Sequence, residues 1–113
     1  MTASYASQVD PQILEELVAR TVAAAGPLRI ILFGSAARGT MGPDSDLDVL
    51  VVVRDGVHRR KTAQAIYRSL KGIGIAKDVI VVTESDVREF GMNRSLVIHP
   101  AITHGKEIYR AAG

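Results

Sequence analysis

The stretch ILFGSAARGTMGPDSDLDVLVVV, residues 31–53, decides how the rest of the chain is interpreted. It reads as an apolar strand, a Gly34-Ser35 break, a short basic turn and a second apolar strand that opens with Asp46 and Asp48. Residues two apart in a strand point to the same face, so the two carboxylates are expected side by side. Neighbouring carboxylates repel each other and lose hydration near a core, which a purely structural strand has little reason to accept. The pattern favours a site for divalent cations.

Length and composition bound the possibilities. The chain has 113 residues and is 47% hydrophobic, enough for one ordinary domain with a core that needs no disulfide or structural metal. It has no cysteine, which excludes disulfides and thiolate zinc sites. The formal net charge of +2 is small, so nucleic-acid binding is not indicated.

The chain carries no sign of a membrane segment or a signal peptide. No apolar run approaches the roughly 18–20 residues that a membrane helix needs. The first ten residues, MTASYASQVD, lack a basic start followed by an apolar run. We expect a cytoplasmic protein with a flexible N-terminus over residues 1–9 and a single domain over residues 10–110.

Apolar periodicity and breaker residues predict alternating helices and strands. The expected helices cover about residues 11–25, 57–70, 84–90 and 95–104, the last two separated by a break near Gly91. The expected strands cover residues 28–33, 46–53, 78–82 and 107–110. Tyr67 shares the apolar spacing of the second helix, so we expect it in the core. The fold class is α/β (α+β), a small mixed sheet of about four strands with helices packed on it.

The Gly34-Ser35 break is suited to receive an anion. A glycine after a strand lets the backbone approach a bound group closely, and amides at the start of a following helical turn attract phosphate. Ser35 adds a hydroxyl donor, and Arg38 lies about one helical turn further on. An ordinary strand-to-helix turn explains Gly-Ser equally well, and the ending of a Walker A loop is absent.

A third acid extends the metal-site hypothesis. Asp46 and Asp48 suit Mg²⁺, which commonly binds through one or two carboxylates together with substrate phosphates. Asp78 opens the next apolar run, and on a neighbouring strand it would meet the other two. Three acids around two metal ions are the arrangement for in-line displacement at phosphorus. The alternatives are exposed acids at strand starts and, for Asp78, a pairing with Lys77 or an arginine.

The whole combination resembles the signature of a known family. Residues 34–48, GSAARGTMGPDSDLD, are similar to the motif of the minimal nucleotidyltransferases, within the DNA polymerase β-like superfamily. That motif is Gly-Ser, then Arg-Gly, then Ser-Asp-x-Asp. Its fixed positions are met by Gly34, Ser35, Arg38, Gly39, Ser45, Asp46 and Asp48. The family's third acid opens a later strand, as Asp78 does, and the resemblance covers most of residues 10–110.

The resemblance implies a polymerase β-like core and nucleotidyl transfer, with ATP as the expected donor of a monophosphate to a hydroxyl. It implies that Gly34 and Ser35 hold the triphosphate, with Ser45 in the same nucleotide-binding set. Arg38 would contact phosphate or brace the loop, and both roles stay open. Asp46 and Asp48 would ligate two Mg²⁺ ions. Asp78 would ligate the catalytic ion and help to deprotonate the acceptor.

The acceptor is less defined than the donor. The chain ends soon after the expected core, so we expect another protein or an oligomer of this chain to supply the acceptor site. In the family that it resembles, small members are commonly encoded beside a HEPN protein and act as its antitoxin, some by moving AMP onto a tyrosine. A HEPN-type partner is therefore implied. The alternatives are a non-catalytic binding module of the same fold and a small-molecule adenylyltransferase of the aminoglycoside-modifying type.

Overall fold

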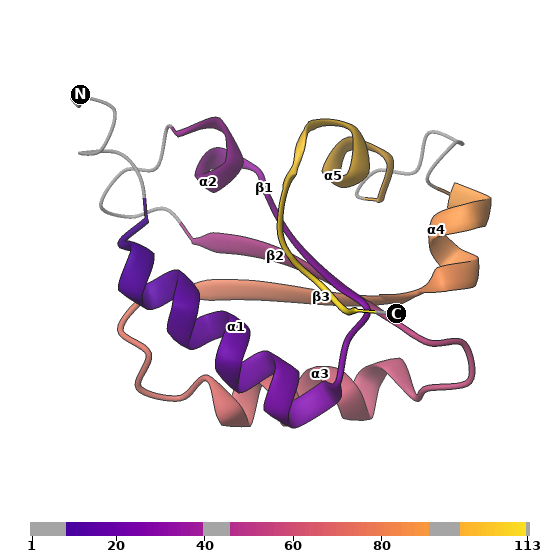
Figure 1. Cartoon of the computed structure of the whole chain (residues 1–113), viewed down its shortest axis with the longest axis horizontal. Helices are drawn as coiled ribbons and strands as arrows, with labels where there is room; N and C mark the ends of the chain where they lie inside the picture. The colour runs from indigo at the N-terminus through magenta and orange to yellow at the C-terminus, as the bar shows by residue number, and fades with distance from the viewer. Residues whose placement is uncertain (1–8, 40–45, 91–97, 113) are drawn as a thin grey trace.

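The structure, a computed structural model, describes residues 9–39, 46–90 and 98–112, without the side chains of Arg38 and Phe90. Helices and strands alternate along the chain (Figure 1). Their bounds are α1 Pro11–Ala25, β1 Arg29–Phe33, α2 Ser35–Arg38, β2 Leu47–Val53, α3 Arg59–Ser69, β3 Lys77–Thr83, α4 Glu84–Phe90, α5 Ile98–His104 and β4 Lys106–Arg110. The expected flexible segment, residues 1–9, lies outside the described residues except for Val9.

The strands form one mixed sheet in the order β3-β2-β1-β4. β1 is antiparallel to both of its neighbours, β2 and β4. β2 and β3 are parallel, and α3 makes the crossover that a parallel pair requires. The expected α/β class with a mixed four-stranded sheet is confirmed.

Helices cover both faces of the sheet. α1 and α3 pack on one face, below the sheet in Figure 1, and α4 and α5 lie on the other. β2 is the most buried strand, with six of its seven residues buried and only Asp48 partly exposed. Its odd-numbered residues, from Leu47 to Val53, face α1 and α3, whereas Leu50 and Val52 face α5. Asp48 therefore lies on the α5 face, at one end of the most buried strand.

The helix boundaries follow the signals in the sequence. The Asp10 carboxylate accepts a hydrogen bond of 2.8 Å from the Gln12 N–H, and Pro11 occupies the first helical position of α1. Gly26 ends α1 in the left-handed conformation. Pro100 lies within the first turn of α5, where its missing N–H has no intrahelical partner, so the helix continues through it. The expected break near Gly91 lies outside the described residues.

Tyr67 departs from the expectation that it belongs to the core. Ile66 and Leu70 are fully buried under α3, whereas Tyr67 is 38% exposed. Successive helical residues are about 100° apart, so Tyr67 lies at the margin of the apolar stripe. Its hydroxyl accepts a hydrogen bond of 2.7 Å from the Val79 N–H on the edge strand β3. The prediction of a core tyrosine is wrong because the side chain reaches past the core to the sheet edge.

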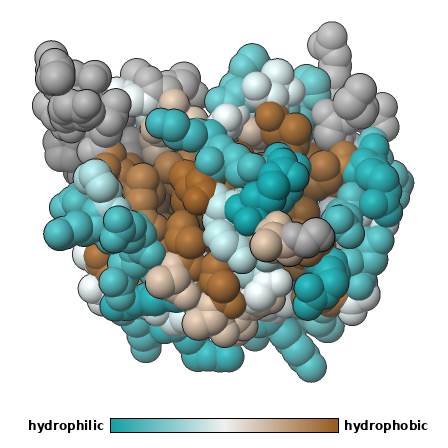
Figure 2. Space-filling model, in the orientation of Figure 1, coloured by the Kyte–Doolittle hydropathy of each residue, from teal (hydrophilic) through white to brown (hydrophobic). Residues whose placement is uncertain are grey.

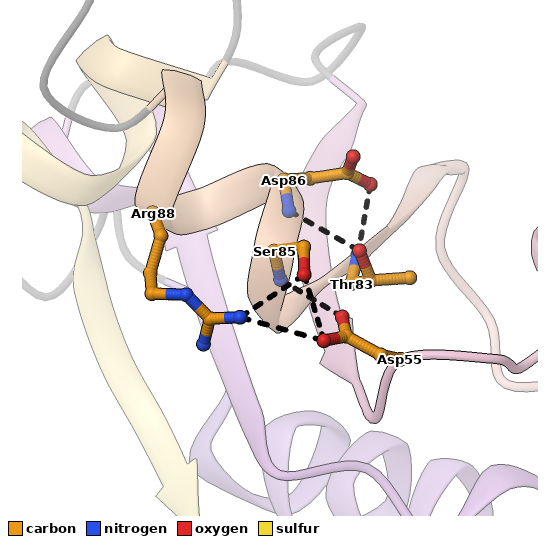
Figure 3. Close-up of polar contacts among 5 residues, drawn as sticks. All are labelled: Asp55, Thr83, Ser85, Asp86 and Arg88. Carbon is orange, nitrogen blue, oxygen red and sulfur yellow. Dashed lines mark hydrogen bonds and ion pairs between the residues drawn. The ribbon is translucent and has the colours of Figure 1, made fainter.

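A capping network fixes α4 at the C-terminal ends of β2 and β3 (Figure 3). The Thr83 hydroxyl accepts from the Asp86 N–H at 3.2 Å, and the Asp86 carboxylate accepts from the Thr83 N–H at 3.0 Å. This reciprocal pair of hydrogen bonds is a capping box with Thr83 as the helix cap. Asp55 accepts from both the N–H and the hydroxyl of Ser85. The Ser85 hydroxyl is the main reason that the pKa of Asp55 lies below its ordinary value, with Arg88 adding to the effect.

Apolar surface reaches solvent between α1 and β4, on the side of the molecule that faces the viewer in Figure 2. A shallow hollow there is lined by Leu14, Glu15, Val18, Ala19 and Ile108. In the part of the chain that the structure describes, no helix is both long and apolar enough to cross a membrane.

We expect Asp86→Asn to reduce the loss of stability at acid pH. Burial tends to raise the pKa of Asp86, but the hydrogen bond from the Thr83 N–H and the pairing with Arg59 outweigh it and hold the pKa below its ordinary value. A carboxylate with a lowered folded-state pKa stabilises the fold above its unfolded pKa of about 4, and this stabilisation is lost as pH falls through the folded-state value. Thermal unfolding across this range should show a smaller fall in Tm for the variant than for the wild type.

Thr83→Ala is the matched control because it removes the capping hydroxyl and keeps the carboxylate. It should lower the free energy of unfolding by about 1 kcal/mol at neutral pH. Its dependence on acid should change less than that of Asp86→Asn, because the Thr83 hydroxyl is the smallest of the causes that lower the pKa of Asp86. An equal acid-induced fall in Tm for the wild type and Asp86→Asn would contradict the assignment.

Candidate functional site

β1 ends in a turn that only glycine accommodates without strain. Gly34 follows Phe33 directly and has φ 67° and ψ −145°, a conformation that is essentially restricted to glycine. The chain then enters the four-residue helix α2, which begins at Ser35. The sequence-based prediction of a Gly-Ser break followed by a short helical turn is confirmed.

Gly34 packs directly against the carboxylate of Asp48. The two lie together because Phe33, at the end of β1, is the register partner of Asp48 in β2. A Cβ on residue 34 would overlap Oδ2 of Asp48 and lie 3.3 Å from its Cγ. Glycine at position 34 is therefore required twice, by its backbone conformation and by the space that the carboxylate fills.

Asp78 lies beside Asp48 on the neighbouring strand. In the parallel β2–β3 ladder the two aspartates are direct register partners. Register partners point to the same face, which is the face that carries Leu50, Ile80 and α5. Asp48 is half-buried, and Asp78 is exposed at the start of the edge strand. The condition under which Asp78 is expected to lie near the other acids, that the second and third strands are neighbours, is met.

Asp46 lies outside the sheet, unlike Asp48 and Asp78. It precedes β2, which begins at Leu47, and its side chain is exposed. Among the described residues, no group of three or more histidine, aspartate or glutamate side chains is close enough together to hold a metal ion. The structure thus brings Asp48 and Asp78 to adjacent positions, while the contribution of Asp46 stays a prediction.

The structure argues against a salt bridge as the reason for Asp78. Lys77 precedes Asp78 in β3, so the two side chains point to opposite faces of the sheet. Within the part of the chain described here, Asp78 forms no ion pair with any lysine or arginine. Its side-chain partner is the Tyr67 hydroxyl, at 3.4 Å from Oδ1.

The remaining predicted phosphate ligands are defined to different extents. Ser35 is half-buried at the first position of α2, directly after Gly34. Arg38 is the last residue of α2, and its side chain lies outside the described part of the structure. Ser45 as a whole also lies outside it. The roles of these three residues stay predictions.

An open pocket of about 510 Å³ adjoins the turn after β1. Among the described residues, its lining includes Phe33, Gly34, Pro100 and His104. Pro100 and His104 come from α5, which packs on β1. Sequence reasoning missed this pocket, because nothing in the sequence indicates that α5 lies beside the Gly34 turn.

The donor set fits a divalent cation shared with an anionic ligand. Mg²⁺ takes oxygen ligands, commonly one or two carboxylates completed by waters and phosphate oxygens. Asp48 and Asp78 present two such carboxylates from adjacent strands. Gly34 lets the backbone at the start of α2 approach that pair, in space that any side chain would fill.

Comparison with known proteins points to one family. The sequence profile of the nucleotidyltransferase domain matches residues 11–100. The fold is similar to the crystal structure of a protein from Sulfolobus solfataricus that is provisionally named a nucleotidyltransferase, with a TM-score of 0.56 and 24% identity over 79% of this chain and 81% of that chain. At this identity the likeness shows a shared fold. No curated protein matches the chain significantly.

We expect Gly34→Ala to destabilise the protein more than Gly26→Ala does. Both glycines have positive φ, but a Cβ at Gly26 meets nothing within 4 Å, whereas at Gly34 it meets the Asp48 carboxylate. The Gly26 variant should lose about 1–2 kcal/mol of unfolding free energy from backbone strain alone. The Gly34 variant should lose about 1–3 kcal/mol more, from overpacking against Asp48 and from a backbone conformation that is more restricted to glycine than that of Gly26. Urea unfolding measures both, and equal losses would show that the contact with Asp48 carries no constraint.

Proposed function

Because the chain belongs to the nucleotidyltransferase domain family, we propose that it transfers AMP from ATP to a hydroxyl group with the help of Mg²⁺. Members of this family move a nucleoside monophosphate from a nucleoside triphosphate and generally use divalent metal ions. That the donor is ATP, that Mg²⁺ is required and that the acceptor is a hydroxyl group are our proposals for this chain. The observation that carries it is the alignment of Asp48 with Asp78 beside the Gly34 turn.

Gly34 and Ser35 bind the triphosphate in this proposal. The backbone amides that follow the Gly34 turn and the Ser35 hydroxyl donate hydrogen bonds to phosphate oxygens in this proposal. Arg38 and Ser45 complete the phosphate contacts. The roles of these four residues come from the family resemblance together with the position of Gly34 against Asp48.

Asp46, Asp48 and Asp78 hold two Mg²⁺ ions in the proposed enzyme. Bound there, Mg²⁺ would neutralise charge on the phosphates and make the acceptor hydroxyl more acidic. The acceptor oxygen forms a bond to the α-phosphorus, the bond to the bridging oxygen breaks, and pyrophosphate leaves with that electron pair. Asp78 receives the hydroxyl proton. Orientation of the reacting groups and charge neutralisation supply most of the rate enhancement in such transfers.

The pocket beside Gly34 is the proposed site of the adenosine. It adjoins the residue that we assign to the triphosphate, and its volume lies within the usual range for small-ligand sites. Phe33 and His104 offer aromatic surface on which a base can stack. The apolar lining suits the faces of a purine, and the open side leaves the acceptor free to approach.

The acceptor that we propose is a hydroxyl on a partner protein, in line with the resemblance to antitoxins of HEPN proteins. A tyrosine is the acceptor residue that the resemblance implies. Masking of such a partner without catalysis and transfer to a small molecule such as an aminoglycoside are the alternatives that experiments must separate.

We expect Asp48→Asn and Asp78→Asn each to reduce transfer at least about 100-fold, because each removes a carboxylate that is proposed to hold Mg²⁺ beside the reacting phosphate. The assay incubates the protein with Mg²⁺, ATP labelled on the α-phosphate and the protein encoded next to it, and follows label on that protein. Asp55→Asn is the matched control. It lies beyond the opposite end of the same strands, in the capping network, and should keep wild-type transfer below the melting temperature.

Tight binding of the neighbouring protein without transferred label would contradict the enzymatic proposal and favour a binding module. Label on an aminoglycoside in the absence of any partner would favour the small-molecule alternative. If the wild type and Asp48→Asn transfer equal amounts of label, the acid pair takes no part in the mechanism.

We expect His104→Ala to weaken ATP binding while leaving tripolyphosphate binding unchanged. Loss of base stacking costs about 1–3 kcal/mol, so the Kd for ATP should rise roughly 5-fold or more. Titration calorimetry with both ligands separates the two contributions, because tripolyphosphate has no base. An equal loss of affinity for both ligands would show that His104 contacts the phosphates. Unchanged affinity for both ligands would show that the adenosine does not bind in this pocket.

A further inference from the structure

Tyr67 reaches Asp78 from the opposite side of the sheet. It belongs to α3, which packs on the face away from α5, and Asp78 lies on the α5 face. β3 is an edge strand, so a side chain from α3 can pass around its outer edge. The Tyr67 hydroxyl lies there, 2.7 Å from the Val79 nitrogen and 3.4 Å from Oδ1 of Asp78.

The hydrogen bonds of this hydroxyl identify its acceptor. The Val79 N–H donates to the Tyr67 oxygen, so the phenolic proton remains for a different partner. Its possible acceptors are the Val79 carbonyl oxygen at 3.5 Å and the Asp78 carboxylate at 3.4 Å. A carboxylate is the stronger acceptor because it carries a charge. Tyr67 therefore joins the backbone of β3 to the side chain of Asp78.

The Asp78 side chain is held by fewer contacts than the side chains of Asp48, Asp55 and Asp86. The Asp48 carboxylate packs directly against Gly34. Asp55 and Asp86 each accept hydrogen bonds from backbone amides and pair with an arginine. Among the residues described, the Tyr67 hydroxyl is the hydrogen-bond donor to Asp78. An exposed aspartate at an edge strand otherwise samples several rotamers, and fixing one of them costs side-chain entropy at each encounter with a ligand.

We propose that Tyr67 is a positioning residue that fixes the rotamer of the Asp78 carboxylate, the register partner of Asp48, for metal binding. This inference rests on the proposed function, because it assigns Tyr67 to the same acid pair. Groups that hydrogen-bond to metal ligands fix their orientation, and their loss typically reduces metal affinity or activity about 10- to 100-fold.

Tyr67→Phe tests the inference, because it keeps the ring and removes the hydroxyl. Mn²⁺ is the probe, and its affinity is obtained from the electron paramagnetic resonance signal of the free ion. The variant should bind Mn²⁺ about 10-fold more weakly than the wild type. In the transfer assay its kcat should fall and its KM for ATP should stay unchanged, since the phosphate and adenosine contacts are intact. In an Asp78→Asn background, Tyr67→Phe should have no further effect on Mn²⁺ affinity.

Tyr109→Phe is the matched control, a tyrosine on β4 at the other edge of the sheet, and it should leave Mn²⁺ affinity unchanged. If Tyr67→Phe lowers Tm but leaves Mn²⁺ affinity and kcat at wild-type values, Tyr67 only covers the sheet edge and the inference is overturned. If Asp48→Asn binds Mn²⁺ as the wild type does, the acid pair is not a metal site and the proposed function itself fails. Loss of affinity with Asp48→Asn but not with Tyr67→Phe overturns the inference alone.

Discussion

The close packing of Gly34 against the Asp48 carboxylate is the constraint on which the rest of the site depends. It joins the turn after β1 to the start of β2, so the backbone that we propose to bind phosphate and the side chain that we propose to bind metal become neighbours. The antiparallel pairing of Phe33 with Asp48 sets this contact, and the parallel β2–β3 ladder then brings in Asp78. Two different strand pairings thus meet at one carboxylate, and a shift of either register would separate the groups.

The acidic residues at the two ends of β2 and β3 lie in different environments. At the C-terminal ends, Asp55 and Asp86 are held by amides, hydroxyls and arginines, which lowers the pKa of both and fixes the start of α4. At the N-terminal ends, Asp48 and Asp78 are register partners on one face of the sheet. Acids of the first kind stabilise a fold. Acids of the second kind repel each other, and a bound cation relieves that repulsion.

Much of the fold could be predicted from the sequence because its signals are local. The Asp10-Pro11 start and Gly26 end of α1, the Gly34 break and the buried run of β2 each follow from a few adjacent residues. The direct pairing of Asp48 with Asp78 could not be predicted, since apolar periodicity places strands without fixing their register. The pocket formed by α5 and the reach of Tyr67 depend on how helices pack across the sheet. Tyr67 also lies one residue from the centre of an apolar stripe, where helical spacing alone does not separate core from edge.

Paramagnetic broadening of backbone amide signals by Mn²⁺, in the presence of a non-hydrolysable ATP analogue, tests the central claim most directly. If the contact between Gly34 and Asp48 builds a shared metal and nucleotide site, the strongest broadening falls on the amides of Gly34, Asp48 and Asp78. The amides of Asp55 and Asp86, at the far ends of the same strands, stay sharp. Broadening centred on the Asp55 end of the sheet, or none at Asp48 and Asp78 when the analogue is bound, would contradict the account.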